Sequence, residues 1–321
     1  MDKKNTIICI TSIKHIKNAY ENLSKFCKII YDPYISQKKL KKVLIDNKNI
    51  IGIFTNPNKQ QFKIDKEILD RTNVKVICTA STGTNHIDME YGKNNDIEVL
   101  SLTKDYNIIK KISSTAELSF ALMLSLIRNI PKSMNAVMSY EWDYEKYIGR
   151  QLNYMTVGII GYGRLGKIFA RFCEPFFKEI IVCDSYKKIK KYRQEGLCKL
   201  LLHSDVIVLH VHLNDETYHM INDKTISSYM KQGCYLINTS RGDVVDERAV
   251  IRGLKNNIIS GYATDVLSDE LGSNINKSPI IKEMNKGANI IVTPHIGGMT
   301  IEAQEIAYLH SIEKLNKFLN N

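Results

Sequence analysis

The 321-residue sequence contains no long apolar run, and this absence excludes one class of protein. The longest candidate, Phe120 to Ile127, is far shorter than the roughly 20 residues that a helix needs to cross a bilayer. The first residues, MDKKNTIICITSIKH, lack the apolar core and the small-residue cleavage site of a signal peptide. We therefore expect a cytoplasmic protein with no membrane partner.

The sequence also lacks any C-x-x-C pair, which argues against a metal site and against thioredoxin-like chemistry. Its seven cysteines are scattered, at positions 9, 27, 78, 173, 183, 198 and 234. Several fall inside apparent strands, where a free cysteine behaves as a small hydrophobe. An odd, scattered set suits a reducing compartment, in agreement with the cytoplasm.

Negative charge is in short supply, since the formal net charge is +11. Such a balance can indicate an anionic partner, either nucleic acid or a phosphorylated substrate. However, the lysine clusters at 38–42 and 187–191 read as solvated helices, without the interleaved aromatic residues of a single-strand binding surface. The joint richness in Lys, Asn and Ile fits the composition of an AT-rich genome. We therefore expect no nucleic-acid partner.

The first third of the chain alternates apolar runs with polar, lysine-rich segments. Strands separated by helices predict a parallel sheet. A longer helix is expected after Ser113, because Ser-Ser-Thr followed by Glu117 is a capping signature, and Pro131 is expected to mark its end. The strands are expected at 5–10, 26–31, 50–54, 74–79 and 97–101.

The middle of the chain holds the most informative stretch, Thr156 to Arg171, which reads TVGIIGYGRLGKIFAR. An apolar run leads into three glycines, and an amphipathic segment follows, so the glycines lie where a buried strand becomes a helix. In a dinucleotide site, Gly161 allows the tight turn, Gly163 lets the backbone approach a pyrophosphate and Gly166 allows close packing. The N–H groups at the helix start then face the phosphates.

An acid follows the next predicted strand and bears on the choice of cofactor. Asp184 comes directly after the run Glu179 to Cys183. There a carboxylate accepts hydrogen bonds from the adenine ribose and repels the 2′-phosphate of NADP. We therefore expect NAD, with NADP as the alternative because Lys187 and Lys188 follow closely.

The second half of the chain predicts six strands with intervening helices, as two mononucleotide-binding halves require. Polar residues follow three of these strands: Arg241 in NTSRGD, Asp265 and Glu270 in ATDVLSDE, and His295 in TPHIGG. Because ligands bind beyond the carboxyl ends of parallel strands, these side chains can converge on one site. The strands are expected at 157–160, 180–183, 206–209, 234–238, 258–263 and 289–292, and a final helix at 299–319.

These motifs together resemble the D-isomer-specific 2-hydroxyacid dehydrogenases, a family that includes D-3-phosphoglycerate, D-lactate and glyoxylate enzymes. The resemblance spans nearly the whole chain and is to the short form, without an appended regulatory domain. It implies an α/β fold of two doubly wound parallel-sheet domains. A Rossmann NAD-binding domain at 107–294 is inserted into a flavodoxin-like substrate domain at 1–106 and 295–321. The motifs are STGTNHID at 81–88, the glycine loop, NTSRG at 238–242 and PHIGG at 294–298.

The resemblance also implies an NAD-dependent oxidoreductase that interconverts a D-2-hydroxy acid and its 2-keto acid, and a homodimer. Arg241 is expected to bind the substrate carboxylate and carbonyl, His295 to act as general acid and base, and Glu270 to orient His295. The turn of Ser81, Thr82 and Gly83 is expected to offer N–H groups to the carboxylate. The expected cofactor contacts are Gly161, Tyr162, Gly163, Arg164, Leu165, Gly166, Asp184, His212, Thr239, Ser240 and Asp265.

Departures from the family pattern and a second function remain open at this stage. His212 and Leu271 stand where many members have proline, so His212 is an additional candidate for contact with the cofactor. Each of the three residues also has a structural alternative. Arg241 could be a surface ion-pair partner, Glu270 a solvated loop acid and His295 a helix cap. Corepressors of the same fold bind NAD(H) as a sensor and can retain all three residues, so a binding protein is the alternative to an enzyme.

Overall fold

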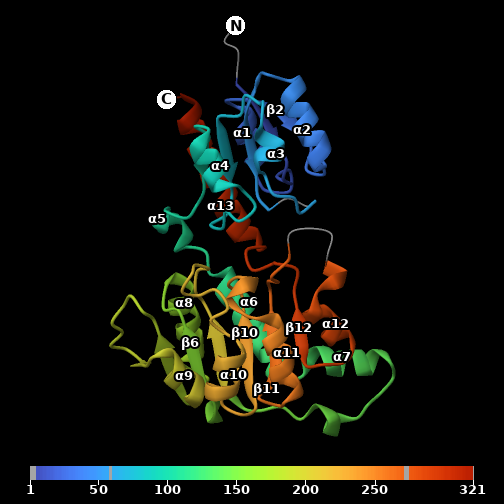
Figure 1. The fold of residues 1–321 in the computed structure, drawn as a ribbon, viewed down its shortest axis with the longest axis vertical. Helices are drawn as coiled ribbons and strands as arrows, with labels where there is room; N and C mark the ends of the chain where they lie inside the picture. Colours follow the sequence, from blue (N-terminus) through green and yellow to red (C-terminus); the bar gives the residue numbers. More distant parts are fainter. Residues whose placement is uncertain (1–4, 58–59, 271–274, 321) are drawn as a thin grey trace. The chain divides into compact units, whose positions relative to one another are not determined.

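The computed structural model describes residues 5–57, 60–270 and 275–320, so Leu271 and the ends of the predicted substrate domain lie outside the described residues. The chain separates into two compact units. Unit 1 contains the chain up to Ile112 and again from Met299, and unit 2 contains Ser113–Glu270 and Asn274–Gly298. Both units are α/β structures (Figure 1). The boundaries expected at 106/107 and 294/295 stay a prediction.

Unit 1 is built on a five-stranded sheet in the order β2-β1-β3-β4-β5, and every strand pair is parallel. This is the flavodoxin-like order, whose topological switch point lies between β1 and β3. The strands are β1 (Thr6–Cys9), β2 (Lys28–Tyr31), β3 (Ile50–Thr55), β4 (Val76–Thr79) and β5 (Glu98–Leu100). The helices are α1 (Ala19–Ser24), α2 (Gln37–Asp46), α3 (Lys66–Leu69), α4 (Met89–Asn94), α5 (Tyr106–Ile109) and α13 (Ile301–Asn320).

Successive side chains of these strands enter different apolar cores, as strand geometry requires. Ile7, Cys9 and Phe54 belong to the core that includes residues of α1 and α13. Ile8 and Ile53 belong to the core that includes residues of α2 and α3. Because both faces of the sheet are covered, its strands are continuous apolar runs rather than alternating ones. The C-terminal helix α13 is therefore an integral layer of unit 1.

Unit 2 is built on a seven-stranded parallel sheet in the order β12-β11-β10-β9-β6-β7-β8. This is the Rossmann order extended by one strand, with its switch point between β6 and β9. The strands are β6 (Thr156–Ile160), β7 (Glu179–Cys183), β8 (Arg193–Gln194), β9 (Val206–Leu209), β10 (Cys234–Asn238), β11 (Ile259–Thr264) and β12 (Ile290–Val292). The doubly wound, two-domain fold class predicted from the sequence is confirmed.

The helices of unit 2 cover both faces of this sheet (Figure 1). They are α6 (Ser114–Ile127), α7 (Ile130–Met138), α8 (Arg164–Cys173), α9 (Leu197–His203), α10 (Asp223–Tyr229), α11 (Glu247–Lys255) and α12 (Pro279–Asn285). Four short 3-10 turns, η1 (Tyr144–Tyr147), η2 (Leu152–Tyr154), η3 (Gly242–Val244) and η4 (Ile275–Lys277), complete the described elements.

Two predictions for the region after β7 are wrong. The lysine cluster at 187–191 lies in a loop and not in a helix, and a seventh strand, β8, follows it. The side chain of Gln194 accepts a hydrogen bond from the Ile189 N–H and donates to the carbonyls of Asp184 and Lys187. These bonds fix the segment as a loop, whereas a polar lysine run alone fits a loop and a solvated helix equally well.

The predicted capping of α6 is also wrong in its mechanism. The helix begins at Ser114 as expected, but no side-chain cap is formed, and the Ser113 hydroxyl donates to the Glu117 carboxylate instead. The helix ends at Ile127, before Asn129, which has the left-handed φ of 53°. Pro131 therefore lies in the first turn of the next helix, α7, where a missing N–H costs nothing.

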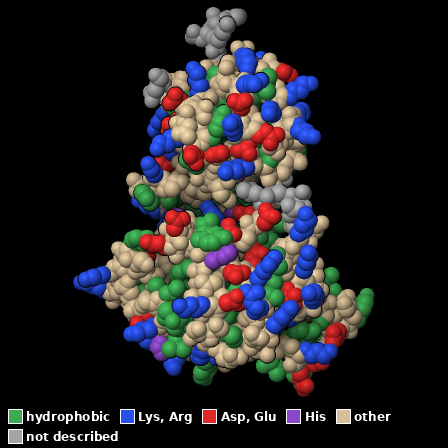
Figure 2. All heavy atoms as spheres, viewed as in Figure 1, with side chains coloured by type: hydrophobic (Ala, Val, Ile, Leu, Met, Phe, Trp, Pro, Cys, Tyr) green, Lys and Arg blue, Asp and Glu red, His purple; other side chains and the backbone are tan. Residues whose placement is uncertain are grey.

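No helix within the described ranges is long and apolar enough to cross a membrane. On the face drawn in Figure 2, basic side chains lie among acidic and polar ones on both units. This mixture agrees with the interpretation that the net charge of +11 reflects the overall composition rather than a binding surface.

Candidate active site

The glycine loop of unit 2 connects β6 to α8 at the switch point of the sheet. Gly161 has a φ of +91°, and a Cβ there would lie 2.3 Å from the carbonyl oxygen of His210. A Cβ on Gly166 would lie 2.0 Å from the carbonyl oxygen of Gly161. By contrast, nothing lies within 4 Å of a Cβ placed on Gly163. Two glycines are thus required by the fold itself, and the third leaves open space at the start of α8.

Asp184 closes the far side of this loop. Its carboxylate accepts the N–H of Tyr162 at 2.8 Å and the N–H of Tyr186 at 3.0 Å. The side chain therefore ties the glycine loop to the loop after β7. Arg164 lies at the start of α8, and burial lowers the pKa of its guanidinium. Tyr162 packs edge-on against Tyr192.

The residues after β10 are held by their own side chains. The Ser240 hydroxyl donates to the carbonyl of Leu209 at the end of β9, and the Thr239 hydroxyl pairs with Ser119 on α6. These contacts fix the backbone from which the Arg241 side chain projects. The Arg241 guanidinium donates to its neighbouring carbonyl, that of Ser240, at 2.7 Å.

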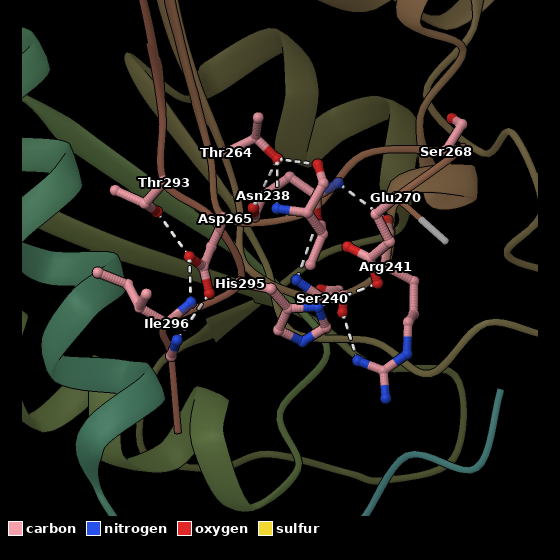
Figure 3. A network of polar contacts seen from close by, with 12 residues as sticks. Asn238, Ser240, Arg241, Thr264, Asp265, Ser268, Glu270, Thr293, His295 and Ile296 are labelled. Atoms are coloured by element: carbon pink, nitrogen blue, oxygen red, sulfur yellow. Dashed lines mark hydrogen bonds and ion pairs between the residues drawn. The ribbon is translucent and has the colours of Figure 1, made fainter. Parts of the chain in front are cut away.

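His295 and Glu270 form the central pair of the site. The Nδ1 atom of His295 lies 3.0 Å from Oε1 of Glu270 (Figure 3). This hydrogen bond raises the pKa of His295 against the opposing effect of burial. Burial lowers the pKa of Arg241, and Glu270 counteracts that effect. Arg241, Glu270 and His295, which follow three different strands, are therefore brought together as the strand order predicted.

Asp265 is buried behind this pair and holds the backbone around His295. It is 2% exposed, and its Oδ1 accepts the Thr293 hydroxyl at 2.6 Å and the Ile296 N–H at 2.8 Å. Its Oδ2 accepts the Gly297 N–H at 2.7 Å. Burial raises the pKa of Asp265, while these donors act in the opposite direction. The anchored loop keeps His295 at the left-handed φ of 54°.

The turn of Ser81, Thr82 and Gly83 belongs to unit 1 and follows β4. The Ser81 hydroxyl donates to the carbonyl of Gly83 at 2.7 Å and pairs with the hydroxyl of Thr79. The Thr82 carbonyl accepts the hydroxyl of Thr103. Among the described residues, none of the three backbone N–H groups of this turn has an acceptor. The Ser81 side chain therefore fixes the turn from within, and the three N–H groups remain available among the described residues.

The loop after β9 contains two histidines with different surroundings. His212 is exposed, and its carbonyl accepts a hydrogen bond from the Thr217 hydroxyl. His210, which the sequence did not single out, is enclosed beside Phe169 and the glycine loop. Burial lowers its pKa to about 3, and neither ring nitrogen has a partner within the described part of the chain. The sequence did offer one indication that His210 lies near the site, because it comes directly after a predicted buried strand.

The glycine loop and Asp184 fit a dinucleotide. No group of three or more His, Cys, Asp or Glu side chains in the described ranges could hold a metal ion. The open space at Gly163 and the carboxylate of Asp184 lie at the two positions where a pyrophosphate and a ribose need them. The N–H groups at the start of α8 are the natural donors to a phosphate.

Comparisons with known proteins agree with this geometry. Residues 120–297 match the model of the D-isomer specific 2-hydroxyacid dehydrogenase NAD-binding domain. A glyoxylate reductase of Thermococcus litoralis is 36% identical over 76% of this chain and 73% of its own. A D-3-phosphoglycerate dehydrogenase of Bacillus subtilis is 31% identical over 75% of this chain and 45% of its own.

A solved structure extends the likeness to both units. The D-lactate dehydrogenase of Aquifex aeolicus, crystallised with NAD and lactic acid, has a TM-score of 0.77 and 28% identity. The match covers 98% of this chain and 96% of that one. The chain belongs to the D-isomer specific 2-hydroxyacid dehydrogenases and is an NAD-dependent oxidoreductase of that family.

Proposed function

We propose that the protein reduces a small 2-keto acid to its D-2-hydroxy acid, with His295 as the general acid, and catalyses the reverse reaction with His295 as the base. The observation that carries the proposal is the 3.0 Å hydrogen bond between His295 and Glu270 beside Arg241. Two similar proteins are named glyoxylate reductase and D-lactate dehydrogenase, and the acids in these names are of this size. NADH supplies the hydride to the carbonyl carbon when it is bound.

His295 provides the proton that the reaction needs. Reduction of a ketone leaves negative charge on its oxygen, and an imidazolium neutralises this charge by donating its proton. Because Glu270 raises the pKa of His295, the acid form persists to higher pH than in a free histidine. The bond to Nδ1 leaves Nε2 as the atom that donates. A positioned acid of this kind contributes about 10²–10⁴ in rate.

Arg241 is proposed to bind the substrate carboxylate and carbonyl. Its guanidinium is planar and offers a fork of donors that fits two oxygen atoms at once. Arg241→Lys should raise the KM for the keto acid strongly, because a point charge cannot replace this fork. An unchanged KM would remove Arg241 from the carboxylate site.

The free N–H groups of Ser81, Thr82 and Gly83 support a second contribution to carboxylate binding. Hydrogen bonds from backbone N–H groups to a charged acceptor are shorter and stronger than those between neutral partners. The internal bonds of the Ser81 hydroxyl fix the turn before the substrate arrives. Little conformational entropy is then lost on binding.

For the cofactor, we propose that the N–H groups at Gly163 and Arg164 bind the pyrophosphate and that Asp184 binds the adenine ribose. Asp184 favours NAD over NADP, because its charge repels a 2′-phosphate. Tyr162, Leu165 and Gly166 shape the loop. Thr239, Ser240, Asp265 and His212 complete the proposed contacts, with Asp265 acting chiefly through the loop that it anchors.

The direct test measures NADH oxidation with glyoxylate, hydroxypyruvate and pyruvate. His295→Ala should abolish turnover while NADH binding stays near that of the wild type, because the histidine acts on the substrate. The exposed His203 at the end of α9 offers a matched control, and His203→Ala should leave both unchanged. Tight NADH binding without turnover of any acid by the wild type would favour the sensor reading instead.

We also propose a homodimer, formed through the segment from α7 to η2. This segment leaves the sheet of unit 2 as an extended excursion (Figure 1) and exposes a run of large apolar side chains. Exposed apolar side chains gathered in one segment favour an interface. Trp142→Asp should shift the mass measured by light scattering from dimer to monomer, and an unchanged mass would refute this interface. The exposed side chains are Met134, Val137, Met138, Tyr140, Trp142, Tyr144, Ile148 and Tyr154.

A further inference from the structure

Unit 1 contains a polar cluster at the switch point of its sheet that the proposed chemistry does not use. Thr11 follows β1, Asn56 follows β3, and Tyr308 projects from α13. The Tyr308 hydroxyl lies 3.2 Å from the Thr11 hydroxyl and accepts the Asn56 side-chain N–H at 3.1 Å. In open α/β sheets, ligands bind beyond the carboxyl ends of the strands at such a point.

Tyr308 is fixed within this cluster. It is 4% exposed, and its ring packs against Phe54 on β3 at a centroid distance of 6.2 Å. Burial raises the pKa of the Tyr308 hydroxyl, so the group is neutral at physiological pH. A neutral hydroxyl that accepts from Asn56 has its own proton left for Thr11. The amide of Asn56 is thereby oriented with its nitrogen toward Tyr308 and its oxygen away from it.

The oxygen of this amide has no partner among the described residues. The Oδ1 atom of Asn56 is buried and accepts no hydrogen bond from any described residue. A buried acceptor without a donor is unfavourable, and native proteins rarely leave one without a reason. The free group is an acceptor, so it calls for a hydroxyl or an N–H group from a ligand.

Asn56 directly follows the strand next to the turn that is proposed to bind the carboxylate. Thr55 pairs with Thr79 across β3 and β4, so Asn56 lies beside the start of the turn at Ser81–Gly83. Neighbouring strands are about 4.8 Å apart. In a three-carbon keto acid, the carboxylate and the substituent on C3 are separated by a similar distance.

We infer that Asn56, oriented by Tyr308, recognises a hydroxyl on C3 of the substrate, and that the preferred substrates are 3-hydroxy-2-keto acids rather than their deoxy analogues. This inference rests on the proposed function, because it assumes that the turn at Ser81–Gly83 binds the carboxylate. The hydroxyl donates to Oδ1 and supplies the partner that the amide oxygen lacks. Tyr308 is a positioning residue, since it acts through Asn56.

The test compares kcat/KM for hydroxypyruvate and pyruvate with NADH. The wild type should prefer hydroxypyruvate by at least about tenfold, since binding the deoxy analogue leaves the buried acceptor unpaired. Asn56→Leu should reduce this ratio to within about threefold, by raising KM for hydroxypyruvate while the value for pyruvate changes little. Tyr308→Phe keeps the ring in the core and should lower the ratio in the same direction.

A matched control is available at the opposite, amino-terminal ends of the strands of the same sheet. Asn73 precedes β4, and its amide donates to the carbonyl of Lys48. Asn73→Leu should leave the substrate ratio unchanged. If the wild type has equal kcat/KM for pyruvate and hydroxypyruvate, the inference is overturned but the proposed function is not. An active Asn56→Leu with an unchanged ratio would have the same consequence, because Oδ1 would then bind only solvent. Turnover of neither acid, nor of glyoxylate, would overturn the proposed function and this inference with it, whereas turnover of glyoxylate alone would overturn only the inference.

Discussion

The three glycines of the loop after β6 should respond differently to the same substitution. Gly161→Ala places a Cβ 2.3 Å from the carbonyl oxygen of His210, on a backbone with a φ of +91°. Gly163→Ala places a Cβ in open space, and the φ of −73° at that position lies outside the left-handed region. The first change therefore tests the fold, and the second tests the binding of the cofactor.

The expected magnitudes follow from these two surroundings. Gly161→Ala adds the left-handed penalty of about 1–2 kcal/mol to an overpacking cost of about 1–3 kcal/mol. For a unit of this size, such a loss lowers Tm by roughly 5–15 °C. Gly163→Ala should change stability by less than about 1 kcal/mol, since the restricted unfolded chain is offset by alanine being a poorer N-cap. Loss of one charge-assisted hydrogen bond to phosphate weakens NADH binding about tenfold to hundredfold.

The assay combines thermal melts followed by circular dichroism with fluorescence titrations of NADH. Gly163→Ala should melt with the wild type and bind NADH weakly, while Gly161→Ala should melt early. If Gly163→Ala binds NADH as well as the wild type, the start of α8 is not the pyrophosphate site. If Gly161→Ala melts with the wild type, the steric argument from the His210 carbonyl is wrong.

Three further changes test other parts of unit 2. In Glu270→Gln, reductase activity should decline at lower pH than in the wild type, because His295 loses the carboxylate that raises its pKa; an unmoved pH profile of kcat/KM would contradict this. Asp184→Ala should raise the ratio of kcat/KM for NADPH to that for NADH about tenfold, since the repulsion of a 2′-phosphate disappears. Asp205→Asn should cost about 1–2 kcal/mol in urea unfolding at pH 7, because Asp205 is 6% exposed but its partners Lys231 and Arg150 are 47% and 44% exposed, so that solvent screens both pairs. Burial raises the pKa of Asp205, but these cations and a backbone N–H outweigh burial and lower the pKa overall. The difference in unfolding free energy between the wild type and Asp205→Asn should therefore narrow as the pH falls below about 4. A difference that stays constant with pH would refute the ionic contribution.

The sequence predicted those features that depend on local patterns. Buried parallel strands are continuous apolar runs, so β6 and β10 were placed within one residue. Because parallel strands end at one edge of a sheet, the convergence of Arg241, Glu270 and His295 could also be predicted. β8 was missed because it has only two residues, both polar, and its position depends on pairing with β7 rather than on its own pattern.

Hydrogen bonds between distant segments lay beyond the reach of the sequence. The Ser240 hydroxyl binds the end of β9, and nothing near Ser240 in the chain indicates that partner. The orientation of Asn56 depends in the same way on Tyr308, which comes from the opposite end of the chain. Such contacts are products of the sheet order, and the sheet order is fixed by the packing of the whole unit.

Two acids within six residues of sequence illustrate how environment assigns their roles. Asp265 spends both carboxylate oxygens on the loop that carries His295, so it sets the position of the ring. Glu270 uses one oxygen on the ring itself, and its Oε2 has no partner in the described part of the chain. Loss of Asp265 should therefore displace His295, whereas loss of the Glu270 charge should leave the ring in place and change its proton affinity. Asp265 therefore controls the position of His295, and Glu270 controls its pKa. General acid catalysis requires both a correctly placed proton donor and a suitable pKa.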